Sequence, residues 1–179
     1  MKFTEQSLRS SERVEPEEFS QKVSSKLGEG AEIEVSYGQV IVRLSPERAL
    51  DALSILKSDP DLDCNYFTFL SAIDWQDDGF EVLIALFSTV HLNTVILKIK
   101  LPKDSPHMPS VTPLYRGANW HERECAEMFG IVFDGHPNPK NLYLSDDFVG
   151  HPLRKDFRLA SRTFKPWPGA KDPGEAGGR

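Results

Sequence analysis

The residues best suited to chemistry in this chain gather between positions 118 and 157. The segment ANWHERECAEMF at 118–129 carries His, Glu, Arg and Cys at helical spacing. A proline-broken stretch follows, with two further histidines, His136 and His151, and an RKD triplet at 154–156. Metal sites and acid–base centres are built from these residue types. Both chemistries therefore have to be weighed.

A metal site is the first possibility. His121 and Cys125 stand four residues apart, which would place them on one helical face, and His136 or His151 could complete a ligand set. The letters HERE resemble the HExxH of zinc proteases, but Cys125 stands where that motif needs its second histidine. Two ligands do not make a site. A metal-dependent hydrolase using His121, Cys125 and His136 is therefore kept only as a distant alternative.

Packing explains the same segment more simply. Arg123 and Glu127 are spaced for an i,i+4 ion pair, and Trp120, Met128 and Phe129 supply an apolar stripe. The chain has no GxSxG motif for a nucleophilic serine and no glycine-rich phosphate-binding motif. The sequence thus predicts a structural helix without a catalytic centre.

The cysteine count limits the cofactors. Cys64 and Cys125 are the two cysteines of the chain, whereas an iron–sulfur cluster is held by about four thiolates. The sequence predicts no cofactor in this chain. If the protein takes part in electron transfer, the redox groups must lie in other chains.

Charge and hydropathy indicate the cellular location of the protein and the kind of partner that it binds. The net charge is −6, yet residues 151–179 carry seven Lys/Arg against three Asp/Glu. A basic tail favours an acidic protein partner, and an acidic body argues against nucleic acid. No window reaches the ~18 apolar residues that cross a bilayer, and the first residues lack the apolar core of a secretory signal. We expect a cytosolic chain.

Apolar periodicity predicts an α+β fold, with a mostly antiparallel sheet and helices on one side, followed by a long extended C-terminal arm. Helices are expected to begin at Pro16 and at Ser45-Pro46, and the helix at 118–129 to end at Gly130. Strands are expected around Ile33–Tyr37 and at 39–44, 66–75, 80–88 and 93–101.

The predicted domain organisation has three parts. Residues 1–13 form a flexible N-terminus, 14–130 the α+β domain, and 131–179 an extended proline-rich, partner-binding arm. Beyond Phe133 the chain has little hydrophobic periodicity and carries six of its thirteen prolines. Such a segment cannot offset its ordering entropy alone. It must lie along a partner or along the domain.

Two features of the arm favour a protein interface. His136 and His151 each precede a proline and are biased towards extended backbone, which suits a projecting side chain. The RKD triplet at 154–156 is flanked by Leu153 and Phe157. Charges beside apolar anchors are typical of protein contacts.

These residues resemble a known family, the C (30 kDa) subunits of respiratory NADH:quinone oxidoreductase, bacterial complex I. The matching positions lie in two blocks, the second being GHPLRKDF at 150–157. They comprise Trp120, Glu122, Arg123, Glu124, Glu127, Met128, Phe129, His136, Lys140, Leu142 and Tyr143, then His151, Pro152, Arg154, Lys155, Asp156 and Phe157.

The resemblance implies a non-catalytic hydrophilic subunit of the peripheral arm of a proton-translocating complex. The family binds no cofactor itself; FMN and iron–sulfur clusters lie in partner subunits. The expected partners are the D (49 kDa) and B subunits, at the cytoplasmic face of the cell membrane. The matching residues are expected at subunit interfaces. Energy-converting hydrogenases and F420H2 dehydrogenases use similar subunits, so an equivalent subunit of such a complex is the alternative.

Overall fold

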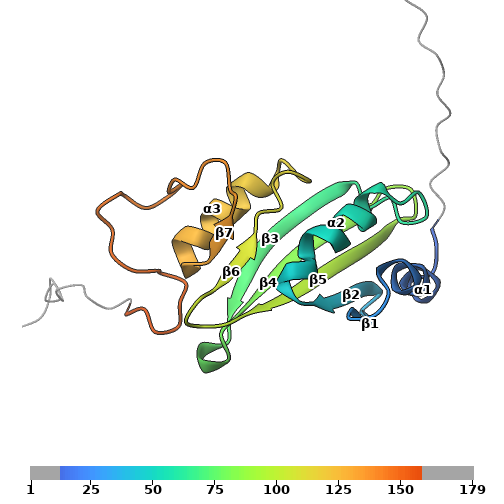
Figure 1. Ribbon diagram of the computed structural model, residues 1–179, viewed down its shortest axis with the longest axis horizontal. Coiled ribbons are helices and arrows are strands. Elements are labelled where there is room, and N and C mark those ends of the chain that lie inside the picture. The colour runs from blue at the N-terminus through green and yellow to red at the C-terminus, as the bar shows by residue number, and fades with distance from the viewer. Residues whose placement is uncertain (1–12, 159–179) are drawn as a thin grey trace, which may run out of the picture.

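A five-stranded sheet forms the centre of the computed structural model, which describes residues 13–158 (Figure 1). Its order is β1-β2-β5-β4-β3, and only the contact between β2 and β5 is parallel. The expected mostly antiparallel sheet is therefore confirmed. The strands are β1 (Glu32–Ser36), β2 (Gln39–Leu44), β3 (Tyr66–Asp74), β4 (Phe80–Ser88) and β5 (Asn93–Leu101).

One face of the sheet carries the core. Along β5, Val95, Leu97 and Ile99 are fully buried, whereas Ile96 and Lys98 between them are only half-buried. This alternation follows from the two-residue period of a strand, which sends successive side chains to opposite faces. The apolar set of each strand thus meets the helices on one side.

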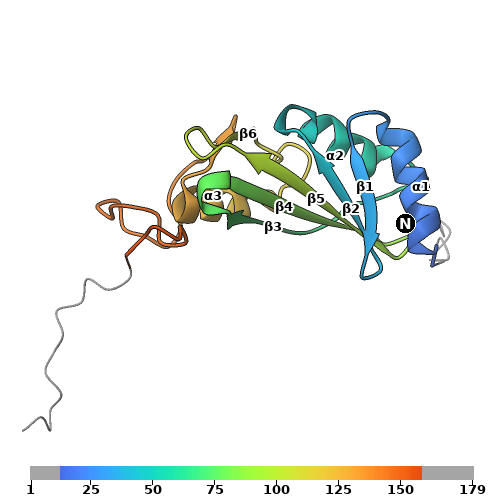
Figure 2. The ribbon, with the colours of Figure 1, turned by 90° about the horizontal axis from the view of Figure 1, so that it is seen from below.

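The helices are α1 (Pro16–Leu27), α2 (Ala49–Ser58) and α3 (Ala118–Phe129), with short 3₁₀ turns at Pro46–Arg48 and Gln76–Asp78. Proline opens α1 at the first helical position, where its missing N–H is not needed. Buried side chains of all three helices join the same core cluster as the inward residues of the strands. Figures 1 and 2 show α1 and α2 at one end of the sheet and α3 at the other, beside β3.

A second, small sheet lies beside α3. It pairs β6 (His107–Pro109) with β7 (Val132–Asp134) in parallel. Ile131 and Phe133 are buried in the core. Residues 131–134, which the sequence prediction assigned to the arm, thus pack in the domain. A three-residue strand with one inward side chain shows no periodicity, so the sequence carried no signal for it. The name C-terminal arm is used below for residues 135–158.

No helix within residues 13–158 is long and apolar enough to cross a membrane. The predicted flexible N-terminus lies outside the described residues except for Arg13, and so does the end of the predicted arm from 159 to 179.

The burial of Phe133 predicts the effect of shortening its side chain. Phe133→Ala should lower the free energy of unfolding of the isolated chain by ~3–5 kcal/mol, because it leaves a cavity in the core. Val132→Ala, at the adjacent exposed position, should cost under about 1 kcal/mol. Urea unfolding measures both. Equal midpoints for the two variants would show that this strand does not complete the core.

Candidate functional site

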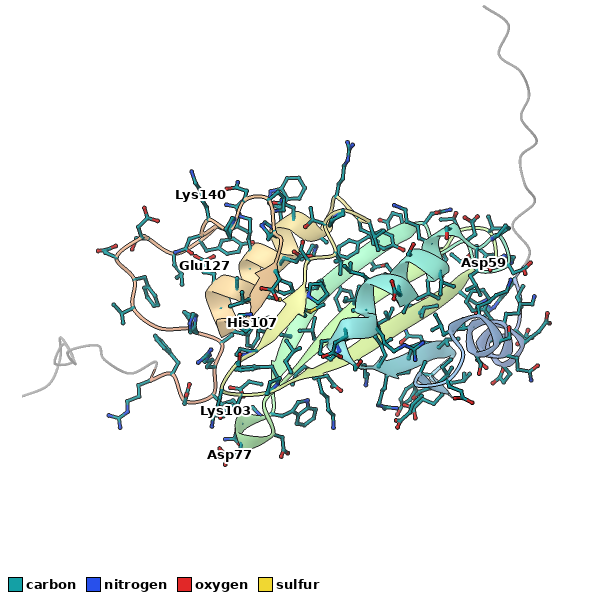
Figure 3. All side chains as sticks on the ribbon, in the orientation of Figure 1. Asp59, Asp77, Lys103, His107, Glu127 and Lys140 are labelled. Carbon is teal, nitrogen blue, oxygen red and sulfur yellow. The ribbon has the colours of Figure 1, made fainter. Side chains whose placement is uncertain are left out.

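The helix α3 and the C-terminal arm meet along one flank of the domain. Figure 3 shows Glu127 on α3 and Lys140 on the arm segment that passes beside it. Many of the residues singled out from the sequence lie at this boundary. We call the set of hydrogen bonds that fixes the C-terminal arm to α3 and β3 the arm lock.

Glu127 holds the arm by its backbone. Its carboxylate accepts hydrogen bonds from the backbone N–H groups of Leu142 (3.0 Å) and Tyr143 (3.1 Å), and from that of Leu144. The residue is only 6% exposed. Because a carboxylate has two oxygens and several acceptor positions, it can satisfy consecutive amides that an irregular segment would otherwise leave unpaired.

These bonds set the ionisation of Glu127. Burial opposes the charged form, but the three backbone N–H groups and the nearby charge of Arg123 outweigh it and hold the pKa below its ordinary value of 4.5. A group with a lowered pKa stabilises the fold in its ionised state. Its contribution is fully present above pH 4.5 and is lost as the pH falls through the lower folded-state value.

Arg123, one helical turn before Glu127, also binds the backbone of the C-terminal arm. Its Nε donates to the carbonyl of Lys140 (2.6 Å) and its Nη2 to that of Asn141 (3.0 Å). The i,i+4 spacing predicted an ion pair with Glu127. The half-exposed guanidinium lies near that carboxylate, but it donates its hydrogen bonds to backbone carbonyls. Arg123 and Glu127 together hold the five consecutive residues 140–144.

The block at 150–157 caps the C-terminal end of α3. The last carbonyls of a helix have no partner within it and carry partial negative charge. Here the carbonyl of Glu127 lies 2.8 Å from Nδ1 of His151, that of Met128 accepts from the N–H of Leu153 (3.1 Å), and that of Phe129 accepts from Nε of Arg154 (2.5 Å). The guanidinium also lies 5.2 Å from the Phe80 ring centroid.

Gly130 makes this cap possible. It ends α3 with a left-handed φ of 73°, a conformation that costs glycine little. A Cβ at this position would lie 2.4 Å from the Arg154 guanidinium and 2.6 Å from the His151 ring. Pro152 stands between the two capping side chains. The glycine therefore serves both the helix end and the close approach of the arm.

The arm is also fixed to the end of β3. Asp74, a buried residue, accepts a hydrogen bond from the backbone N–H of Lys155 at 2.8 Å. The Lys155 ammonium lies 5.9 Å from the Trp75 ring centroid. Phe157 stacks against Phe148 with ring centroids 6.0 Å apart. Asp74 was not singled out from the sequence, although an acidic residue closing an apolar strand was a usable signal.

A buried polar cluster lies on the inner side of α3. Glu122 is fully buried and accepts hydrogen bonds from Oγ of Ser110 (2.7 Å) and the N–H of Val111 (2.7 Å), with Oγ1 of Thr112 at 3.3 Å. Burial raises the pKa of Glu122 despite these donors and the nearby His136. The cluster ties the segment before α3 to the helix.

His136 joins that cluster to the start of the arm. Its Nδ1 accepts the N–H of Asn138 (3.0 Å), so the proton of the neutral ring sits on Nε2. Nε2 lies 3.2 Å from the carbonyl of Asn119 and 3.8 Å from Glu122. The His136 ring thus fixes the backbone where the C-terminal arm leaves the domain.

The ligands of the hydrolase alternative are not brought together. His121 Nδ1 lies 3.1 Å from the carbonyl of Leu70. Cys125 is buried, which raises the pKa of its thiol to about 12, so the thiolate is scarce at neutral pH. Within residues 13–158 no three His, Cys, Asp or Glu side chains are placed to hold a metal ion.

The remaining predicted residues vary in exposure. Met128 packs partly against the core, Glu124 is half-buried, and Trp120 is 64% exposed. Lys140 and Asp156 have exposed side chains. Their predicted place at subunit interfaces stays a prediction.

The contact at 140–144 predicts protease sensitivity. Glu127→Gln should speed trypsin cleavage after Lys140 about tenfold or more, because hydrogen bonds to a charged group contribute ~1.5–3 kcal/mol. Arg123→Ala should act in the same direction, since Arg123 bonds the carbonyl of the cleaved peptide bond. Glu124→Gln on the same helix is the matched control. Equal cleavage rates in all variants would contradict the contact.

Substitutions at two glycines distinguish the effect of losing the cap from the effect of backbone strain. Gly130 and Gly135 both have left-handed φ, but only a Cβ at Gly130 would meet the arm. Gly135→Ala should cost ~1 kcal/mol of stability through φ alone. Gly130→Ala should cost more and should also expose the peptide bond after Arg154 to trypsin. Thermal unfolding and cleavage rates measure both, and identical behaviour of the two variants would argue against the cap.

Sequence comparison identifies relatives of this chain. The family "Respiratory-chain NADH dehydrogenase, 30 Kd subunit" matches residues 42–163. The C subunit of the NADH-quinone oxidoreductase of Roseiflexus sp. (strain RS-1) is 39% identical over 126 residues, covering 69% of this chain and 72% of that protein. The C subunit of the same enzyme from Citrifermentans bemidjiense is 37% identical over 134 residues, covering 74% and 82%.

Two solved structures are similar in fold. One is the "trypsin-resistant fragment (1-134)" of Nqo5, with a TM-score of 0.58 and 27% identity over 68% of this chain and 97% of that one. The other belongs to an archaeal membrane-bound sulfane sulfur reductase, with a TM-score of 0.64 and 22% identity, covering 87% of this chain and 98% of that one. The second likeness concerns the fold alone. Since the family model matches residues 42–163 and relatives named as C subunits are 37–39% identical, the chain belongs to the family of 30 kDa subunits of the respiratory-chain NADH dehydrogenase.

Proposed function

We propose that the chain is a non-catalytic subunit of the peripheral arm of proton-translocating NADH:quinone oxidoreductase. It supports electron transfer from NADH to quinone by holding other subunits together. FMN and iron–sulfur clusters belong to those subunits, and this chain binds no cofactor of its own. The chain works at the cytoplasmic face of the cell membrane and reaches the membrane only through the complex.

One observation supports a structural role above all. The side chains that could do chemistry are bonded to the chain's own backbone: Glu127 and Arg123 to residues 140–144, and His151 and Arg154 to the end of α3. A catalytic group needs a free position towards a substrate. These groups are occupied in positioning the C-terminal arm, which is the expected use in a subunit that joins others.

Other subunits of the complex are its partners, and we assign the contacts of the C-terminal arm to the D (49 kDa) and B subunits. The positive charge of residues 151–179 suits an acidic partner surface. The fold likeness to a chain of a membrane-bound complex covers 87% of this chain. A similar fold found inside such an assembly supports a role in contacts between subunits.

An equivalent subunit of a related complex is the second candidate, and the fold likeness to the sulfane sulfur reductase chain favours keeping it. Energy-converting hydrogenases and F420H2 dehydrogenases are complexes of this kind. The sequence relatives named as NADH-quinone oxidoreductase subunits favour the first proposal. An activity assay on membranes from the native cells distinguishes the two candidate functions. NADH-dependent quinone reduction that disappears on deletion of this chain supports the NADH enzyme.

Removing the end of the C-terminal arm tests the proposal. A chain ending at residue 149 loses the cap on α3, so it should unfold at a lower temperature but keep its sheet and core. In a strain lacking the native subunit, it should fail to enter the complex, and membrane-bound NADH:quinone activity should be lost. The full-length chain is the control. Full activity from the shortened chain would contradict the proposed role of the C-terminal arm.

A further inference from the structure

A buried pair of titratable side chains lies where the C-terminal arm leaves the domain. The side chains of His136, at the start of the arm, and Glu122, on α3, are 3% and 0% exposed, and Nε2 of His136 lies 3.8 Å from Oε2 of Glu122. We propose that this pair is a proton-dependent latch. Neutral His136 holds the arm at Asn138, and uptake of a proton turns the ring to Glu122 and frees Asn138.

The hydrogen bonds of the His136 ring require its neutral form. Nδ1 accepts the backbone N–H of Asn138 at 3.0 Å, and Nε2 donates to the carbonyl of Asn119 at 3.2 Å. An imidazolium carries a proton on both ring nitrogens and has no acceptor left. When His136 takes up a proton at Nδ1, two N–H groups therefore face each other, and the bond to Asn138 is lost.

Glu122 provides a place for the charged ring. Its carboxylate accepts hydrogen bonds from the hydroxyl of Ser110 and the N–H of Val111, both at 2.7 Å, and these donors stabilise its ionised form. An ionised carboxylate at this distance attracts an imidazolium more strongly than it attracts a neutral ring. The proton that breaks the bond to Asn138 thus strengthens the contact between His136 and Glu122.

The pair faces a cavity of about 560 Å³, which leaves room for the ring to turn. The other charged or titratable groups that line this cavity are Arg123 of α3, Asp134 of β7 and His151 of the arm. Arg123 donates to two carbonyls of the arm, and the Asp134 carboxylate lies 3.4 Å from Nδ1 of His107. Nδ1 of His151 donates to a carbonyl of α3, a bond that a second ring proton leaves intact. Among these groups, His136 is the one whose hydrogen bond is broken by a proton.

The latch acts on a short stretch of the C-terminal arm. From residue 140 onwards the arm is held by Glu127 and Arg123. Before that point, both neighbours of Asn138 are prolines without an N–H group, so Asn138 supplies the N–H by which this stretch is held. Pro139 lines the cavity together with His136. Loss of the bond to Asn138 therefore loosens one wall of the cavity.

A pH titration of the full-length chain by NMR tests the latch. From about pH 8 to about pH 5.5, a range around the usual histidine pKa of about 6.5, the ring of His136 and the amide of Asn138 should change their signals together. Exchange of the Asn138 N–H with water, corrected for the direct effect of pH, should rise about tenfold, as expected for the loss of one hydrogen bond. The amides of β4 are the internal reference and should keep their protection.

The variant His136→Asn separates the latch from other effects of pH. The side-chain oxygen of asparagine can accept the N–H two residues later, as in an Asx turn, and it does not titrate. Exchange at Asn138 should then be the same at both ends of the pH range. His107→Asn is the matched control, since it removes an exposed histidine beside Asp134, and it should keep the response of the unaltered chain.

The results that overturn the inference are distinct. The latch is wrong if exchange at Asn138 does not change in the unaltered chain, or if it changes equally in His136→Asn. It is also wrong if the N–H of Val111 responds in place of Asn138, because the proton has then gone to Glu122, or if β4 loses its protection at the same pH. Should His136→Asn fail to fold, the unaltered chain decides, since His136 and Asn138 must titrate at one pH.

Discussion

Every backbone N–H and C=O group that leaves water needs a partner, and this requirement governs the C-terminal arm. Between residues 135 and 158 the arm has no strand or helix to pair its own backbone. Beside turns within the arm, its partners come from side chains of α3 and from Asp74, and the unpaired carbonyls of α3 take theirs from the arm. Two segments that would each be incomplete alone thus satisfy one another.

This exchange explains why so many charged residues gather along α3 and the C-terminal arm. A carboxylate accepts several amides at once, and a guanidinium donates to two carbonyls at fixed angles. Glu127 and Arg123 each use that capacity on the arm. Arg154 adds a positive charge at the negative end of a helix. The cluster is suited to organising backbone, and its composition alone does not reveal that use.

Sequence reasoning located elements whose signal is local. Pro16 and Gly130 mark a helix start and a helix end, and the alternation along β5 identifies its buried face. It could not find β6 and β7, since three-residue strands lack periodicity, or the bond between Asp74 and Lys155, since those residues are 81 positions apart. Arg123 and Glu127 have ion-pair spacing, but the backbone that they bind is specified by tertiary structure alone.

The position of the capping residues also sets an order of events during synthesis. Chains emerge from their N-terminus, and domains fold as units on the way. The cap on α3 comes from residues 151–154, which are made after every strand and helix of the domain. A nascent chain can therefore have a folded sheet while its last helix is still uncapped. Only a chain synthesised past Arg154 can form the complete arm lock. The arm lock therefore distinguishes such chains from shorter, partly synthesised ones.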